Sequence, residues 1–298
     1  MPMRLAAACA LVLAVAAACT TAEAPAAATA TAPGAGEPGI GEAASDAAML
    51  TPPAPAPPEP DGLGFRTLVI GTDATYPPFE SMTEQGTIEG VDPSLMAAIC
   101  ELASCVPEFQ NTAWDGIFAA LGAGEFDVLM SAITILPERE ADSNATFTKA
   151  YFEVGQVILK RGDDTAIAGP DDLSGDVKVG VQTGTTGDTA ATEGLGVPTD
   201  NIVRFETVVL AVQALLNGDV DAVVLDNPTA EIFVGQHADD LEVAGEAFTT
   251  EQYGILVPNS APEVLAALNS AIDTLQETGR IDEIVGQWYQ VDEAADGG

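Results

Sequence analysis

Short apolar runs alternate with longer amphipathic stretches from about residue 65 to residue 290. Runs rich in branched aliphatic residues and bounded by Gly or Asp predict buried strands, and they lie at 68–70, 126–130, 177–181 and 220–225. Apolar residues at helical spacing predict helices over 93–103, 114–121, 208–216, 262–275 and 281–289. Strands that alternate with helices in this way predict an α/β architecture.

Polar residues recur where the predicted strands stop. Asp73, Thr134, Thr186 and Asp226 occupy such positions. The ends of strands in an α/β sheet share one edge, and ligands bind in the crevice there. The four side chains are therefore expected to converge on a crevice, although Tyr76 in the first of these loops could equally be a packing residue.

The N-terminal segment has the pattern of an export signal over residues 1–18. Arg4 supplies the positive region, an apolar stretch follows, and small residues precede Cys19. A Cys after small residues resembles a lipobox, in which Cys19 would carry the lipid anchor to the membrane. Ala16 stands where a lipobox usually has Leu, so ordinary secretion stays open. Residues 19–64 are rich in Ala and Pro, without Lys or Arg, and are expected to form a disordered tether.

The charge of the chain is strongly negative, with 46 acidic and 9 basic residues and a net charge of −37. Such a chain repels phosphate backbones, which argues against nucleic-acid binding. The acidity could attract cationic ligands, or it could reflect solubility or salty surroundings. Cys100 and Cys105 are expected to form a disulfide because the chain has an export signal. His237 is the single histidine, and no set of residues has metal-ligand spacing, so no metal or other cofactor is expected.

Several motifs occur in a fixed order over residues 66–290. They are the segments 71–80 (GTDATYPPFE), 111–116 (NTAWDG), 133–139 (ITILPER), 180–187 (GVQTGTTG) and 221–226 (DAVVLD). Together they resemble bacterial solute-binding proteins of the polar amino-acid type (family 3), which feed ABC transporters. The resemblance implies a two-lobed periplasmic-binding-protein-like fold, in which each lobe is a mixed β-sheet flanked by helices and two crossover strands join the lobes.

The resemblance also implies where the lobes begin and end. Lobe 1 is expected over 65–153 and 253–292, lobe 2 over 154–252, and a tail over 293–298. The two crossings are expected near 153–156 and 249–253.

Five residues match positions that hold the backbone of an amino-acid ligand in this family. Arg139 would bind the α-carboxylate bidentately, and Asp226 would bind the α-ammonium. Thr134 would offer a backbone N–H and a hydroxyl, Ala132 a carbonyl, and Thr186 a backbone N–H. Alternatively, Arg139 is a surface arginine paired with a neighbouring Glu, and Asp226 caps the following helix.

Five further residues would contact the ligand side chain, namely Asp73, Tyr76, Trp114, Ser131 and Gln182. Two aromatic faces and a carboxylate favour a planar or cationic group. We therefore expect arginine, lysine, histidine or glutamine as the ligand. Trp114 could instead be a core residue.

The implied function is capture of an amino acid and its delivery to the permease subunits of an ABC transporter, by a monomer in the bacterial cell envelope. The protein would be anchored outside the cytoplasmic membrane or be periplasmic. A ligand sensor for a separate receptor is an alternative, and an enzyme resembling cyclohexadienyl dehydratase is another. Enzymatic function would need a general acid or base at the ligand, and Asp73 is the one obvious free carboxylate in these motifs.

Overall fold

The computed structural model describes residues 62–289. The expected signal peptide, the lipidated Cys19, nearly all of the tether and the tail lie outside these residues. The chain contacts the folded body from Leu63, whose N–H donates to the carbonyl of Ala103 (2.7 Å), two residues before the predicted start. No helix within 62–289 combines the length and the apolar character needed to cross a bilayer.

The first lobe contains a five-stranded mixed sheet in the order β5-β1-β6-β15-β7. Strands β1, β5 and β6 run parallel, whereas β15 runs antiparallel to β6 and β7. The same lobe also contains a small sheet in the order β2-β3-β4. The elements of this lobe are β1 (Arg66–Thr72), β2 (Thr75–Tyr76), β3 (Glu80–Met82), β4 (Ile88–Glu89), α1 (Val91–Ala103), β5 (Cys105–Asn111), α2 (Ile117–Gly122), β6 (Val128–Leu129), α3 (Pro137–Ser143), β7 (Ala145–Phe147), β15 (Leu256–Pro258), α7 (Pro262–Glu277) and α8 (Arg280–Trp288).

The second lobe has a mixed sheet in the order β11-β10-β12-β9-β13, in which β9 runs antiparallel to both of its neighbours. Its elements are β9 (Gln156–Arg161), β10 (Val179–Gln182), α4 (Thr186–Thr189), β11 (Ile202–Phe205), α5 (Val208–Asn217), β12 (Ala222–Asp226), α6 (Asn227–Gln236) and β13 (Leu241–Ala244), with short 3₁₀ or π turns at Pro170–Asp172, Ala190–Gly194 and Thr199–Asn201.

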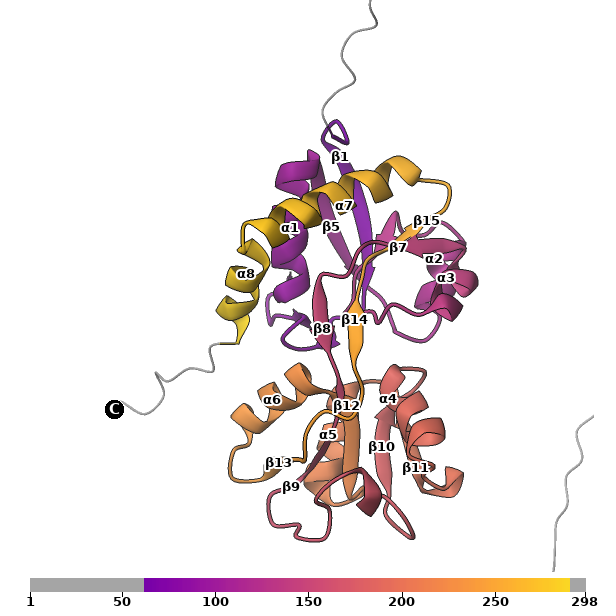
Figure 1. Cartoon of the computed structure of the whole chain (residues 1–298), viewed down its shortest axis with the longest axis vertical. Coiled ribbons are helices and arrows are strands. Elements are labelled where there is room, and N and C mark those ends of the chain that lie inside the picture. The colour runs from indigo at the N-terminus through magenta and orange to yellow at the C-terminus, as the bar shows by residue number, and fades with distance from the viewer. Residues whose placement is uncertain (1–61, 290–298) are drawn as a thin grey trace, which may run out of the picture. The chain divides into compact units, whose positions relative to one another are not determined.

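Two antiparallel strands connect the lobes. They are β8 (Phe152–Val154) and β14 (Glu251–Tyr253), and Figure 1 shows them side by side between the two sheets. The two-lobed α/β fold that the resemblance implied is confirmed. The loops that end β1, β6, β10 and β12 lie next to the two connecting strands, so the fold brings these loops of both lobes together.

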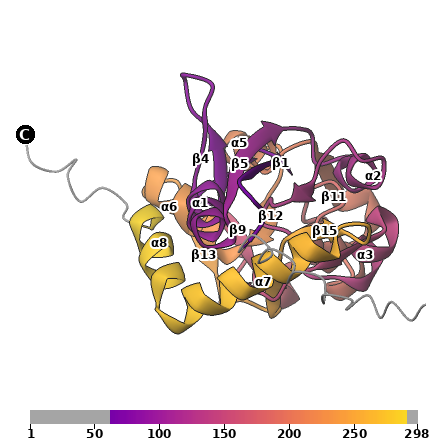
Figure 2. The same cartoon turned by 90° about the horizontal axis from the view of Figure 1, so that it is seen from above.

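Helices α1, α7 and α8 pack on one another in the first lobe, as Figure 2 shows from above. Their apolar faces bury Leu95, Ile99, Leu268 and Ile272 completely. Burial of an aliphatic side chain contributes about 1.5–3 kcal/mol, so this contact is a main source of stability in the lobe.

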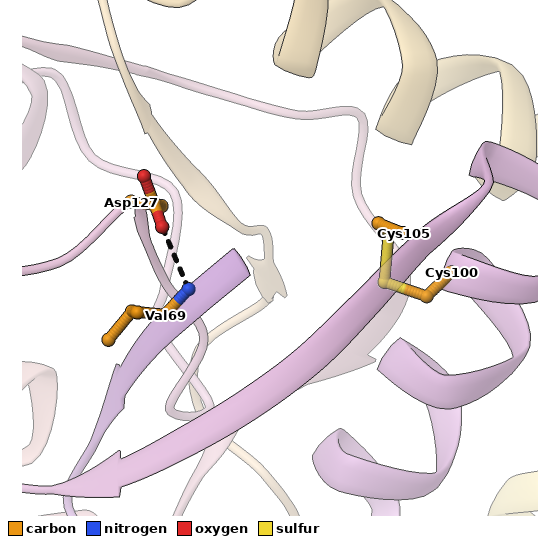
Figure 3. The surroundings of a disulfide bond; sticks show 4 residues. All are labelled: Val69, Cys100, Cys105 and Asp127. Carbon is orange, nitrogen blue, oxygen red and sulfur yellow. Dashed lines mark hydrogen bonds between the residues drawn. A yellow bond between two sulfur atoms is a disulfide. The ribbon is translucent and has the colours of Figure 1, made fainter. Parts of the chain in front are cut away.

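The predicted disulfide is confirmed. Cys100 in α1 bonds to Cys105 at the start of β5, with Cα atoms 4.6 Å apart (Figure 3). The chain reverses between them through Ser104, which has a left-handed φ of 55° and ends α1. Figure 3 also shows the backbone N–H of Val69 in β1, which donates to Asp127 Oδ2 (2.8 Å) and so anchors the segment before β6 to β1.

Helix α2 begins at Ile117, three residues later than the pattern predicts. The delay arises at Gly116, whose φ of 88° ends the preceding loop in a conformation that favours glycine. Trp114 is therefore a loop residue and not the first residue of a helix.

Candidate functional site

All ten residues predicted to bind a ligand line one cavity between the lobes. The cavity contains about 460 Å³ of space that protein atoms do not fill, part of it open to solvent. The predicted residues are Asp73, Tyr76, Trp114, Ser131, Ala132, Thr134, Arg139, Gln182, Thr186 and Asp226. Seven residues that were not predicted complete the lining: Glu80, Gln156, Thr185, Gly187, Val208, Val224 and Leu225.

Arg139 projects from the first turns of α3 and is only 6% exposed. Its Nη1 donates to the carbonyl of Thr134 (2.9 Å), and its Cζ lies 5.2 Å from the centroid of the Trp114 ring and 5.5 Å from that of Phe118. The Trp114 and Phe118 rings meet edge to face at 5.3 Å. The aromatic pair therefore orients the guanidinium and shields it from water.

Within residues 62–289, Arg139 is the one buried cation without an acidic partner. Lys160, which is equally buried, forms an ion pair with Glu242 at 2.8 Å. Arg139 has no carboxylate within 4.0 Å in this part of the chain, so the alternative of a surface arginine paired with Glu138 or Glu140 is wrong. Burial lowers the pKa of Arg139 relative to its ordinary value, because water no longer stabilises the charged form.

Asp226 ends β12 on the other side of the cavity and is 6% exposed. Its Oδ2 accepts hydrogen bonds from the Tyr76 hydroxyl (2.7 Å) and the Tyr253 hydroxyl (2.6 Å), and its Oδ1 accepts one from Gln156 Nε2. Tyr76 comes from the first lobe, Gln156 from β9 in the second lobe, and Tyr253 from the crossing strand β14. All of these donors are neutral.

Burial raises the pKa of Asp226 to about 6, although the hydrogen bonds from Tyr253, Tyr76 and Gln156 oppose the shift. The alternative that Asp226 caps the next helix is also wrong. Asp226 does occupy the position before α6, but its side chain makes no capping hydrogen bond. Its carboxylate is instead held toward the cavity.

Asp73 lies in the loop after β1 and is 5% exposed. Its carboxylate accepts from the Thr75 hydroxyl (2.8 Å) and, across the cavity, from Gln182 Nε2 (2.9 Å). Burial raises the pKa of Asp73, while these two hydrogen bonds oppose the shift. Asp73 and Gln182 were both predicted to contact the ligand side chain, and their side chains are joined by this hydrogen bond.

The segment Ser131–Thr134 follows β6 and faces the same cavity. Its second residue, Ala132, has a left-handed φ of 46°, a conformation that costs a non-glycine residue about 1–2 kcal/mol. The backbone N–H of Ala132 donates to Asp92 Oδ2 (2.9 Å), and the Ser131 hydroxyl donates to Glu80 Oε1 (2.9 Å). The strained turn is thus held by two buried carboxyl groups beneath it.

The second-lobe loop at 182–188 is held by an ion pair. Arg204 donates from Nε to Asp188 Oδ2 (2.9 Å) and from Nη2 to Asp188 Oδ1 (2.8 Å), and the Gly184 N–H donates to the same carboxylate (3.1 Å). Burial would raise the pKa of Asp188, but the hydrogen bonds from Arg204 and Gly184 hold it below its usual value. The Thr186 hydroxyl accepts from Gln156 Nε2 (3.1 Å) at the cavity wall.

Sequence reasoning missed Glu80, Gln156, Glu251 and Tyr253. Glu251 in β14 accepts from the Thr134 hydroxyl (2.8 Å), so the crossing strand also contacts the segment Ser131–Thr134 that lines the cavity. Gln156 and Glu251 fall in the predicted crossings, and their position between the lobes was a usable signal. Glu80 ends the first motif, and its position after two prolines and Phe79 was a weaker signal. Within 62–289, no group of three or more His, Cys, Asp or Glu side chains is placed to hold a metal ion.

Comparison with known proteins agrees with this architecture. The family described as bacterial extracellular solute-binding proteins, family 3, matches residues 68–291. A probable histidine-binding protein of Neisseria gonorrhoeae is 35% identical over 223 residues, which cover 74% of this chain and 82% of that protein.

Two solved structures are similar over the same region. The arginine-, lysine- and histidine-binding protein ArtJ from Geobacillus stearothermophilus is 37% identical, with a TM-score of 0.67, over 75% of this chain and 95% of that one. The ancestral amino-acid-binding protein AncCDT-1, a precursor of cyclohexadienyl dehydratase, is 35% identical, with a TM-score of 0.69, over 75% of this chain and 96% of that one. The chain belongs to the bacterial extracellular solute-binding proteins of family 3.

Proposed function

We propose that the protein binds a free amino acid with a cationic or polar side chain between its lobes and delivers it to the permease of an ABC transporter. One observation carries the proposal. A buried guanidinium without an acidic partner, Arg139, and a buried carboxylate with only neutral donors, Asp226, line one cavity from opposite lobes. Two unlike charges that are both buried and not paired with each other suit a zwitterion, which would supply a partner to each.

The two charges would divide the ligand backbone between them. The α-carboxylate would bind Arg139 and backbone groups at Thr134 and Thr186, and the α-ammonium would bind Asp226 and the carbonyl of Ala132. Because Asp226 reaches a ligand on Arg139 only when the lobes are close, the ligand would bind the closed state more tightly than the open state. This difference in affinity would drive closure.

The side chain of the ligand would lie between Tyr76 and Trp114 and reach Asp73, Ser131 and Gln182. The Asp73 carboxylate has neutral hydrogen-bond partners and no cation within 4.0 Å among the described residues, which favours a guanidinium, ammonium or imidazolium group. The names of the relatives, which specify histidine, arginine and lysine, support the same class. Arginine, lysine and histidine are therefore the preferred ligands, followed by glutamine.

Calorimetry with arginine analogues tests the zwitterion directly. L-Arginine should bind, whereas agmatine, which lacks the carboxylate, and argininic acid, which lacks the ammonium, should each bind at least about a hundredfold more weakly, because each leaves one buried charge without a partner. A thermal-shift screen with the common amino acids ranks the side chains, since a bound ligand stabilises the protein by mass action. Agmatine binding as tight as that of arginine would contradict the role of Arg139.

The location of the protein has a separate test. We propose that Cys19 carries a lipid that anchors the protein outside the cytoplasmic membrane. Cys19→Ser should shift the protein from the membrane fraction to the soluble fraction, and a membrane-bound variant would contradict the anchor.

Similarity to a precursor of cyclohexadienyl dehydratase makes an enzyme the second candidate. Asp73 and Glu80 both line the cavity, and a carboxyl group with a raised pKa can act as a general acid. Incubation of the purified protein with a prephenate-like cyclic acid decides this point: catalytic turnover would favour the enzyme, and its absence together with arginine binding would favour transport.

A further inference from the structure

Two buried carboxyl groups lie close together beneath the Ser131–Ala132 turn. Glu80 comes from β3 and Asp92 from the first turn of α1, and both are 0% exposed. The Asp92 N–H donates to the carbonyl of Phe79 (3.0 Å), and the two carboxyl groups accept from the adjacent residues Ser131 and Ala132, which brings them close together. Neither forms an ion pair with any cation in residues 62–289. The other titratable groups that face the pair are Asp73 and Tyr151. Two adjacent carboxylates cannot both stay ionised in such a site, so the pair holds a proton.

The hydrogen bonds of the pair indicate which residue carries the proton. Both oxygens of Asp92 accept: Oδ1 from the Tyr151 hydroxyl (2.9 Å) and Oδ2 from the Ala132 N–H (2.9 Å). Glu80 uses Oε1 to accept from the Ser131 hydroxyl (2.9 Å), whereas its Oε2 is buried and has no donor. A proton on Glu80 Oε2 turns this oxygen into a donor to Asp92 and removes the unsatisfied position.

The electrostatics agree with this placement. Burial, and then the negative charge of Asp92, raise the pKa of Glu80 well above its usual value. Burial raises the pKa of Asp92 to about 6, while hydrogen bonds from Ala132 and Tyr151 oppose the shift. The better hydrogen-bonded carboxylate is thus the one that stays ionised more readily.

The pair supports both halves of the cavity wall. Asp92 holds Ala132 in its left-handed conformation, and Glu80 holds the Ser131 hydroxyl, which in turn accepts from the Asp73 N–H (2.9 Å). Ala132 lies in the half proposed for the ligand backbone and Asp73 in the half proposed for its side chain. A substitution at Glu80 or Asp92 is therefore expected to affect both halves of the cavity wall.

We propose that Glu80 and Asp92 are positioning residues for the ligand site: a neutral Glu80 donates its proton to an ionised Asp92, and together they fix the Ser131–Ala132 turn. The part of this proposal that concerns ligand affinity rests on the proposed function. The placement of the proton concerns the ligand-free protein and can be tested without any ligand.

The two isosteric amide variants should behave differently. In Glu80→Gln the amide N–H₂ can replace the donated proton and the amide oxygen can still accept from Ser131, so the loss of affinity for L-arginine should be smaller than in Asp92→Asn. In Asp92→Asn an amide N–H₂ replaces an oxygen that must accept, so L-arginine should bind at least about tenfold more weakly. The reverse order, or equal effects of the two variants, would overturn the proposal. Glu89→Gln, an exposed change in the neighbouring strand, is the matched control.

The pH dependence of thermal unfolding shows whether Glu80 carries a proton in the folded protein or only packs against its neighbours. An unfolded Glu80 ionises near its ordinary pKa of 4.5, whereas the folded protein keeps the proton, so wild-type stability should fall as the pH rises from about 4.5 to 7. Ligand-free Glu80→Gln has no such proton, and its midpoint should fall less over the same range. Glu89→Gln should follow wild type.

Parallel curves for wild type and Glu80→Gln would overturn the proton placement. If Asp92→Asn does not fold, this comparison still decides the matter. If wild-type protein binds none of the common amino acids, the proposed function fails while the pH curves remain informative about the pair.

Discussion

Two arginines near the cavity have opposite environments. Arg204 is about one-third exposed and grips Asp188 with two hydrogen bonds within the second lobe. Arg139 is buried in the first lobe and has no carboxylate within 4.0 Å among residues 62–289, although Asp226 lines the same cavity. One arginine is paired inside its own lobe, and the other faces an acid in the opposite lobe without reaching it.

The pKa shifts of the two acids follow from this difference. Asp188, with a cation in contact, has a pKa below its usual value, whereas that of Asp226, with neutral donors only, is raised to about 6. The Arg204–Asp188 ion pair stabilises a loop within one lobe. Arg139 and Asp226 lie on different lobes and are not paired, so a bound ligand can supply the opposite charge to each and stabilise the protein. The comparison predicts that loss of Arg139 affects binding and loss of Arg204 affects stability.

The largest effect is expected from Arg139→Ala. It should weaken binding of L-arginine about a thousandfold, or about 4 kcal/mol, because the ligand carboxylate would lose its charged partner in a buried site. The thermal midpoint of the ligand-free protein should not fall, since the variant removes an unpaired buried charge. Calorimetry and thermal unfolding measure the two quantities. Arg66→Ala, at an exposed position, is the control, and near-normal affinity in Arg139→Ala would remove the basis of the comparison.

Asp226→Asn should weaken binding about a hundredfold, because a neutral amide keeps some hydrogen bonds to the ammonium but loses the charge. The ligand-free variant should be as stable as wild type or more so at pH 7, since burial of the carboxylate no longer has a cost. Titration calorimetry at constant salt gives the first value. An affinity within threefold of wild type would show that Asp226 is not the partner of the ammonium.

Most of the fold and the cavity lining could be predicted because they follow from local patterns and ordered motifs. Strand-end residues such as Asp73 and Asp226 do lie at one crevice, as the topology of α/β sheets requires. The predicted crossings placed Gln156 and Glu251 between the lobes, but their hydrogen bonds to Thr186 and Thr134 could not be predicted, since these form only in the folded arrangement of the lobes.

The partners of Asp226 were equally out of reach of the sequence. Its position before a helix with Pro228 in the first turn is typical of an N-cap. Only the tertiary approach of Tyr76 and Tyr253 turns its carboxylate toward the cavity. The start of α2 illustrates the same limit, because the pattern around Trp114 is helical but Gly116 has a left-handed conformation.

Affinity for L-arginine should fall about tenfold when the pH is lowered from 7 to 5. Asp226 has a pKa of about 6 without ligand, and only its ionised form attracts the ammonium. The stability of the ligand-free protein should change in the opposite direction. A raised folded-state pKa means that the contribution of Asp226 becomes less favourable as the pH rises from about 4 to 6. Calorimetry across this range checks the first statement, and Asp226→Asn, whose profile should be flatter, is the control.

The smallest effect on affinity is expected from Arg204→Ala, which completes the comparison. Its ion pair is partly exposed, so its loss should cost about 1 kcal/mol of stability, which lowers the thermal midpoint by about 2–4 °C. Binding of L-arginine should stay within about threefold of wild type, because Thr185 still accepts from the Asp188 N–H and keeps the loop in place. Thermal unfolding and calorimetry on the same preparation measure both. A loss of affinity as large as that of Arg139→Ala, at an unchanged midpoint, would mean that Arg204 belongs to the ligand site. An ion pair within one lobe would then not distinguish an arginine that stabilises the fold from one that binds the ligand.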